Sequence, residues 1–210
     1  MMPAVELAAQ AEVLMLMMNS ALQPAQPEAV DMGLGVKWAS CNLGATAPEE
    51  YGNYYSWAEV APKGDYLWDT YAYKGEGPWG MTKYNKGFQL NYQAEAEDDA
   101  AAATLGDGWR MPTSAEMTEL VNNTDWKWGE LNGVKGYTVT SQKNGNSIFL
   151  PAAGYMDGKE LRYAGSAGRY WSQTRHPYHP QCGMNIFFST EYHYVYFYER
   201  YRGYTIRPVK

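Results

Sequence analysis

The sequence predicts an α+β fold, with two short helices in the middle of the chain and antiparallel strands mostly after them. Helix signals fall between residues 96 and 122, whereas strand-like segments dominate from residue 136 onward. Strands and helices therefore do not alternate along the chain, which favours antiparallel pairing over a parallel sheet. The 21 glycines among 210 residues indicate many turns and few long helices.

Composition describes a globular chain that is long enough to bury a sizeable core. A length of 210 residues suits one domain, or one domain with an appendage. Hydrophobic residues make up 45% and charged residues 19%, which is typical of folded proteins. The formal net charge is -6, so the chain has no basic field with which to bind a nucleic acid. We therefore expect no nucleic-acid partner.

The first 29 residues form a separate segment, with a predicted helix at about 4–22 that ends near Pro24 and a linker at 23–29. The apolar run Val13 to Met18 resembles a signal-peptide core, but the first basic residue is Lys37. The run is also too short to span a bilayer, so we expect no transmembrane segment. Two interpretations stay open: the helix packs on its own domain, or it forms a homo-oligomer contact or an attachment segment.

The main domain, residues 30–210, begins with a predicted strand at 36–41. The next stretch, 52–86, is rich in Tyr and Trp with frequent turns, and is predicted to be irregular structure held by buried aromatic rings. A short helix is predicted at 96–106, because acidic residues precede it and Gly106 ends it.

A capping box predicts the second helix, at 114–122. Thr113 is followed three residues later by Glu116, so each side chain can bond a free backbone amide of the first turn. We expect Arg110 to pair with a carboxylate near this helix start. After the helix, 136–141 and 147–155 flank an Asn-Gly turn, which predicts a β-hairpin.

Tyrosine recurs at every second position late in the chain, in the stretch EYHYVYFYERYRGY at 191–204. A period of two is typical of a strand, whose successive side chains point to opposite faces. The intervening residues are mixed, so neither face is a plain aliphatic core. Two interpretations remain: the tyrosines pack against one another within a sheet, or they form a binding surface like an antibody paratope, where Tyr gives large rigid contact area.

Five ordered blocks carry a family resemblance across about 30–210. They are VDMGLGVKWASCNLGATAPEEYGNYYSWAE, GWRMPTSAEMTEL, NGNSIFLPAAGY, GRYWSQT and YTIRPV. The first resembles the opening of the fibrobacter-type major paralogous domain, and the second resembles the signature of C-type-lectin-fold domains related to formylglycine-generating enzymes. The resemblance implies a C-type lectin fold, with antiparallel sheets, two short helices and irregular aromatic-rich loops.

Some relatives in that family are variable proteins of diversity-generating retroelements, in which a reverse transcriptase rewrites adenines in a C-terminal cassette. The resemblance places this cassette at about 170–206, where the chain has all three of its histidines but no Lys and no Asp. It implies that the following residues contact a ligand: Arg175, His176, Tyr178, His179, Phe187, Ser189, Tyr192, Tyr194, Tyr196, Tyr198 and Arg202. Other cassette residues look like scaffold: Tyr170, Trp171, Ile186, Phe188, Tyr204 and Ile206.

The resemblance predicts a non-enzymatic module, on a cell surface or a phage particle, that binds a protein or glycan. One alternative is an undiversified surface paralogue with a structural or glycan-binding role. Another is an oxidase of the formylglycine-generating kind, but Cys41 and Cys182 do not match its catalytic cysteine pair. A calcium-dependent lectin is a third, although neither Glu-Pro-Asn nor Gln-Pro-Asp occurs in the chain.

No cofactor and no metal are expected. His176, His179 and Cys182 have a spacing that could hold Zn²⁺. A diversified loop also produces such clusters by chance, so we do not predict a zinc site. Whether Cys41 and Cys182 form a disulfide cannot be decided from their positions in the sequence.

Overall fold

The computed structural model describes residues 10, 15, 26–77, 80–90 and 92–210. The predicted helix at 4–22 lies outside these residues, apart from positions 10 and 15, as does the homo-oligomer contact predicted for it. In the part of the chain that is described, no helix is long and apolar enough to cross a membrane.

The described chain consists of antiparallel strands with few helices, which confirms the α+β class. The helical segments are two 3₁₀ turns, η1 (Trp68–Thr70) and η2 (Ala96–Asp98), and the helices α2 (Ala100–Leu105) and α3 (Ser114–Asn122). The strands are β1 (Ala29–Asp31), β2 (Lys37–Ala39), β3 (Thr124–Leu131), β4 (Val134–Ser141), β5 (Ser147–Pro151), β6 (Tyr155–Asp157), β7 (Glu160–Arg162), β8 (Ala167–Arg175), β9 (Cys182–Ser189) and β10 (His193–Glu199).

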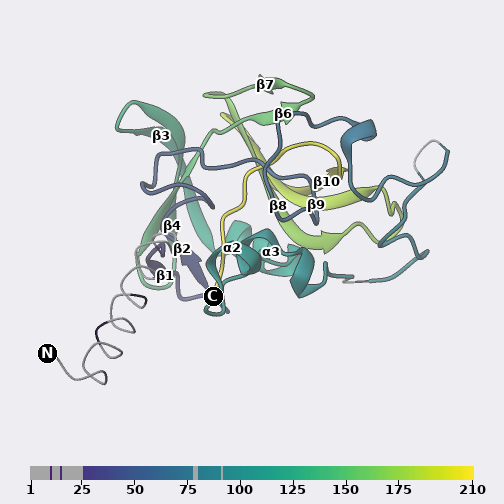
Figure 1. Ribbon diagram of the computed structural model, residues 1–210. Coiled ribbons are helices and arrows are strands. Elements are labelled where there is room, and N and C mark those ends of the chain that lie inside the picture. The colour runs from purple at the N-terminus through teal and green to yellow at the C-terminus, as the bar shows by residue number, and fades with distance from the viewer. Residues whose placement is uncertain (1–9, 11–14, 16–25, 78–79, 91) are drawn as a thin grey trace, which may run out of the picture.

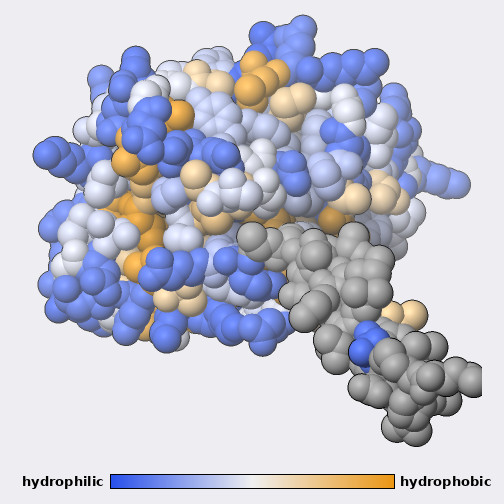
Figure 2. Space-filling model, turned by 60° about the vertical axis from the view of Figure 1, so that its left-hand side comes forward, coloured by the Kyte–Doolittle hydropathy of each residue, from blue (hydrophilic) through white to orange (hydrophobic). Residues whose placement is uncertain are grey.

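Two three-stranded sheets organise the domain, with strand orders β3-β4-β5 and β10-β9-β8. Two hairpins, β1-β2 and β6-β7, flank them, and every pair of these strands is antiparallel. In Figure 1 the β6-β7 hairpin lies above the β8-β9-β10 sheet, while α2 and α3 lie below it. The side of the molecule shown in Figure 2 has a largely hydrophilic surface, and hydrophobic residues appear there only in small patches.

The predicted hairpin forms between β4 and β5, with Tyr137 opposite Leu150. Strand β3, which was not predicted from the sequence, pairs along its whole length with β4. The β3-β4 turn is an Asn132-Gly133 pair in which both residues have left-handed backbone angles, φ 50° and 85°. A two-residue hairpin turn of type I′ needs such angles, and Asn-Gly supplies them with little strain.

The predicted helix at 96–106 is interrupted at Asp99, so only 100–105 is α-helical. Asp99 has an extended backbone, and its side chain accepts hydrogen bonds from the backbone N–H of Ala101 (2.9 Å) and Ala102 (3.0 Å). It also accepts one from Met111 N–H at 2.8 Å. Asp99 therefore begins α2 as its N-cap instead of continuing a helix from residue 96.

Helix α3 has the predicted bounds and the predicted capping box. The Thr113 hydroxyl accepts from Glu116 N–H (3.1 Å), and the Glu116 carboxylate accepts from Thr113 N–H (2.8 Å). Arg110 makes the expected pair by donating from two nitrogens to Glu116, at 2.8 and 2.6 Å. This two-pronged contact joins the end of the preceding loop to the first turn of α3.

Glu116→Gln is expected to destabilise the domain by about 1 kcal/mol at pH 7, by weakening the cap and the Arg110 pair. Burial raises the pKa of Glu116, but the Arg110 and Thr113 hydrogen bonds outweigh it and hold this pKa below its ordinary value. The contribution is present above the unfolded pKa of about 4.3 and is lost as pH falls through the folded pKa. Urea unfolding between pH 3 and 7 should therefore show wild type and variant converging at low pH.

The matched control for that measurement is Glu130→Gln on strand β3, where the carboxylate is exposed. We expect this variant to follow the wild-type pH profile. A Glu116→Gln protein that keeps the full pH dependence would contradict the role given to the Glu116 carboxylate.

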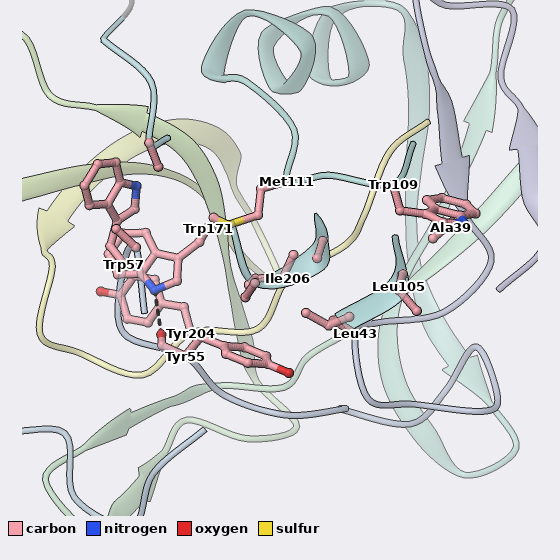
Figure 3. Packing of buried hydrophobic residues seen from close by; sticks show 14 of the residues in the cluster. Ala39, Leu43, Tyr55, Trp57, Leu105, Trp109, Met111, Trp171, Tyr204 and Ile206 are labelled. Carbon is pink, nitrogen blue, oxygen red and sulfur yellow. Dashed lines mark hydrogen bonds between the residues drawn. The ribbon is translucent and has the colours of Figure 1, made fainter. Parts of the chain in front are cut away.

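Stacked aromatic rings fill the first hydrophobic core. Trp171 of β8 stacks on Tyr204 with centroids 4.0 Å apart, and its indole N–H donates to the Tyr55 carbonyl at 2.8 Å, as Figure 3 shows. Trp57 donates to the Ser172 carbonyl at 2.8 Å. Because Tyr55 and Trp57 lie in the irregular stretch 52–86, the expectation that buried aromatics hold this stretch is confirmed.

The second core lies between the two three-stranded sheets. Phe188 of β9 packs edge-on to Tyr137 of β4, with centroids 5.4 Å apart, and Tyr170 stacks on Phe188 at 5.7 Å. All six cassette residues predicted to be scaffold are buried, with exposed fractions of 2% or less: Tyr170, Trp171, Ile186, Phe188, Tyr204 and Ile206.

The last seven residues, 204–210, form a C-terminal segment that runs between distant parts of the chain. Its backbone bonds Tyr55, Leu43, Ala39 and Lys37 at 2.9–3.0 Å, and Val209 exchanges two further hydrogen bonds with Arg110. Its Arg207 is fully buried and donates to the carbonyls of Ala39, Ser40 and Phe149 and to the Asn42 side chain. The segment thus joins the opening strands to both cores.

Candidate functional site

Tyr192, Tyr194, Tyr196 and Tyr198, which we call the tyrosine ladder, lie on the outer face of the β10-β9-β8 sheet. Residues directly opposite in an antiparallel sheet share a face, and Tyr194 lies opposite Phe187, which in turn lies opposite Arg169. The alternating residues His193 and Val195 point the other way, toward the second core. There, His193 stacks on Trp126 with centroids 4.6 Å apart. The mixed composition of β10 therefore reflects two different faces.

Three of the four ladder tyrosines are well exposed: Tyr192 (61%), Tyr194 (42%) and Tyr196 (45%). Tyr198 differs because it packs against the first core and is only partly exposed. Neighbouring rings support the exposed ones, since Tyr194 lies 5.3 Å from Phe187 and Tyr196 stacks on Phe197 at 4.8 Å. The expectation of an accessible ladder is confirmed for three positions and holds in part for the fourth.

The loop between β8 and β9 contacts β10 through Phe197, which lies between Tyr196 and Tyr198 in the strand, whereas the Tyr178 ring packs against Phe88 with centroids 4.9 Å apart. His176 contacts Phe197 of β10 with ring centroids 4.0 Å apart and stacks on His179 at 4.8 Å. Its Nδ1 accepts from the backbone N–H of Tyr178 (3.3 Å) and His179 (3.0 Å). Burial, followed by the neighbouring His179 and Arg175, lowers the pKa of His176. Tyr178 and His179 project into solvent at the loop tip.

The prediction that Arg175 contacts a ligand is wrong, because its side chain is fully buried. The guanidinium donates to the backbone carbonyls of Tyr84 (3.1 Å), Gly87 (2.8 Å) and Lys86. Arg175 lies after an irregularity in the β8-β9 register, so its side chain turns inward. These hydrogen bonds fix the backbone of residues 84–87 to the end of β8.

Arg202 lies at the edge of the same face, but two carboxylates already neutralise it. It contacts Asp157 at 2.8 Å and Glu199 at 3.2 Å, and only 16% of its side chain is exposed. Burial lowers its pKa, but the Asp157 contact and the other nearby groups outweigh it, so the net pKa is raised. Its main visible role is to join β10 to the β6-β7 hairpin.

A groove of about 440 Å³ opens next to the ladder, between β8, β9, β10 and the β6-β7 hairpin. Phe187, Ser189 and Tyr198, all predicted as contact residues, line one side. The remaining lining residues were not predicted from the sequence: Tyr155, Tyr163, Ser166, Ala167 and Arg169. A signal for one of them existed, because Arg169 is a charged residue within the strand-like block GRYWSQT. Ser166 and Ala167 lie at the start of β8 beside Arg169, whereas Tyr155 and Tyr163 are brought there by the β6-β7 hairpin and the turn after it.

The two cysteines are free thiols, and both are buried. Burial raises the pKa of Cys182 to about 12 and also raises the pKa of Cys41. Within the described residues, no group of three or more His, Cys, Asp or Glu side chains is arranged to hold a metal ion. His176, His179 and Cys182 therefore do not converge on one point, and Cys182 lies inside the fold.

Comparisons with models of protein families, with curated proteins and with solved structures found no match to this chain.

Proposed function

We propose that this protein is a non-enzymatic binding module with a C-type lectin fold. Its ligand, a protein or a glycan, is held by the exposed aromatic face of β10 together with the loop after β8. One observation carries the proposal: within 170–206 the predicted scaffold residues are buried, whereas five predicted contact residues are exposed, namely Tyr178, His179, Tyr192, Tyr194 and Tyr196. Five others are half-buried, namely His176, Phe187, Ser189, Tyr198 and Arg202, and Arg175 is buried.

The physical chemistry of the face suits recognition. Tyr side chains bring a large rigid area with few rotatable bonds, and their hydroxyls both donate and accept hydrogen bonds. At this face they stand on a sheet whose opposite side is packed in the second core. Rigid support of this kind lets exposed side chains change without disturbing the strands beneath them. The same property supports the proposal that a retroelement diversifies the cassette and that the protein is displayed on a cell or phage surface.

The buried thiols favour binding over the oxidase alternative. A thiol reacts as the thiolate, and burial keeps Cys41 and Cys182 protonated. The proposed diversification has a direct genetic test. Sequencing the DNA beside the gene should reveal a near-copy of the 170–206 coding segment that differs almost only at adenines, next to a reverse-transcriptase gene. Without such a copy, the variation would be that of an ordinary paralogue.

Two display libraries test the binding function. The first randomises a set on the aromatic face: Tyr178, Phe187, Ser189, Tyr192, Tyr194 and Tyr196. The control randomises one face of the β3-β4 pair, away from the proposed site: Asp125, Lys127, Thr138 and Thr140. After selection against one purified test protein, lysozyme, we expect folded binders from the first library and few from the second.

In the selected binders, affinity is expected to depend on two or three central aromatic or Arg side chains. Truncating each to Ala should cost about 2 kcal/mol or more, whereas positions at the rim should cost little. EDTA should leave affinity unchanged, because no anchor needs a metal. Titration calorimetry measures both effects. Equal yields from the two libraries, or unfolded products from the first, would contradict the proposal.

A further inference from the structure

We propose that the groove beside the ladder is a subsite for an acidic sugar residue, with Arg169 binding its carboxylate. This inference rests on the proposed binding function and adds a ligand class to it. The groove residues Arg169, Tyr155, Tyr163 and Ser166 precede the cassette at 170–206, whereas Phe187, Ser189 and Tyr198 on its other side belong to the cassette.

Arg169 is held in place by aromatic rings. Its guanidinium carbon lies 4.6 Å from the Phe187 ring centroid, 4.7 Å from Tyr198 and 5.2 Å from Tyr155. A cation within about 6 Å of a ring face is attracted to it, and such contacts restrict the side chain without using its hydrogen-bond donors. The guanidinium is therefore fixed in position at the groove while its N–H groups stay free for a ligand.

No carboxylate neutralises this cation among the residues that the structure describes. Its guanidinium has no ion pair within 4.0 Å and makes no hydrogen bond to a protein acceptor there. Its neighbours differ: Arg202 has Asp157 and Glu199, and Arg162 has Glu160. An ordered, partly buried arginine with free donors is complementary to a planar carboxylate, which it can bind with two parallel hydrogen bonds.

The shape of the groove favours a sugar ring over an acidic protein side chain. A volume of about 440 Å³ is within the range of small-molecule sites. Tyr163 is 65% exposed and stacks on Tyr155 at 6.0 Å, which provides an apolar wall for a ring face. Ser166 and Ser189 also line the groove; the Ser166 hydroxyl donates to the Tyr163 carbonyl at 3.0 Å, and its oxygen can still accept from a sugar hydroxyl. A lone Asp or Glu side chain would leave most of this lining unused.

The test uses methyl β-D-glucuronide as the probe and methyl β-D-glucoside as its neutral match, titrated into the full chain and followed by NMR shifts. We expect the glucuronide to bind at least tenfold more tightly and to perturb the signals of Tyr155, Tyr163 and Tyr198. Arg169→Gln should lower this affinity at least tenfold. Arg169→Lys, which keeps the charge but loses the planar fork, should fall between. Arg162→Gln is the matched control and should bind like wild type.

Three outcomes would overturn the inference: equal binding of the two sugars, unchanged glucuronide affinity in Arg169→Gln, or binding of N-acetylglutamate amide with none of the glucuronide. The last result would indicate a protein carboxylate as the ligand. Thermal melts show whether Arg169→Gln is folded, and Arg169→Lys gives a second reading if it is not. If the glucuronide fails while the aromatic-face library still yields binders, only the subsite is wrong.

Discussion

Replacing Trp171 with Ala is expected to lower the free energy of unfolding by about 3–5 kcal/mol, as for other large core side chains. Trp171 is fully buried, stacks on Tyr204 and donates its indole N–H to the Tyr55 carbonyl. Alanine would leave a cavity in the first core and would remove one of the two hydrogen bonds that the Tyr55 carbonyl accepts, the other coming from Tyr204 N–H. Urea unfolding at pH 7 gives the difference directly.

The matched variant replaces Tyr192, Tyr194 and Tyr196 together with Ser. These side chains lie at the surface, so each substitution should change stability by about 0.5 kcal/mol or less. A triple variant that loses as much stability as Trp171→Ala would mean that the ladder is structural. The proposed binding face would then lose its main support.

Arg207→Ala is expected to cost about 3 kcal/mol or more, because several buried acceptors would lose their donor at about 1–3 kcal/mol each. The guanidinium donates to Phe149 O at 2.7 Å, Asn42 Oδ1 at 2.9 Å and Ala39 O at 3.0 Å. No carboxylate within ion-pair distance balances its charge among the described residues, so hydrogen bonds alone hold it there. Thermal and urea unfolding measure the loss.

Arg162→Ala is the control, because Arg162 is exposed and, among the residues that the structure describes, its one ion pair is with Glu160. Its effect should stay within about 0.5 kcal/mol. Arg207→Lys should lose an intermediate amount of stability, because a single ammonium group cannot donate to all the acceptors that the forked guanidinium reaches. An Arg207→Ala protein as stable as Arg162→Ala would show that water replaces the guanidinium at no cost.

Local chemistry made much of the fold predictable. The Thr113–Glu116 capping box located the start of α3, and the Asn-Gly signal located the β4-β5 hairpin. Asn132-Gly133 is a turn signal of the same type, but it was not used in the prediction, and β3 was therefore not predicted. At Asp99, a side chain that caps one helix ended the segment before it, a competition that helix propensity alone does not resolve.

The candidate site was predictable only where alternation governs it. The period of two along β10 and the family resemblance identified exposed Tyr192, Tyr194 and Tyr196. The prediction that Arg175 contacts a ligand was wrong because its side chain turns inward after the register irregularity in β8. The groove was missed because residues from the β6-β7 hairpin meet Arg169 only through tertiary packing, for which no short pattern exists.

The position of the C-terminal segment also has a consequence for biosynthesis. Residues 204–210 complete the first core through Tyr204 and Ile206, and they supply backbone partners to Leu43, Ala39 and Lys37. A ribosome makes these residues after everything they bind, so neither core can close while the chain is still short of residue 209. Domains generally fold as units during or after synthesis. We therefore expect both cores to stay open until residues 204–210 have been made, so that the aromatic stretch 52–86 is not packed before then.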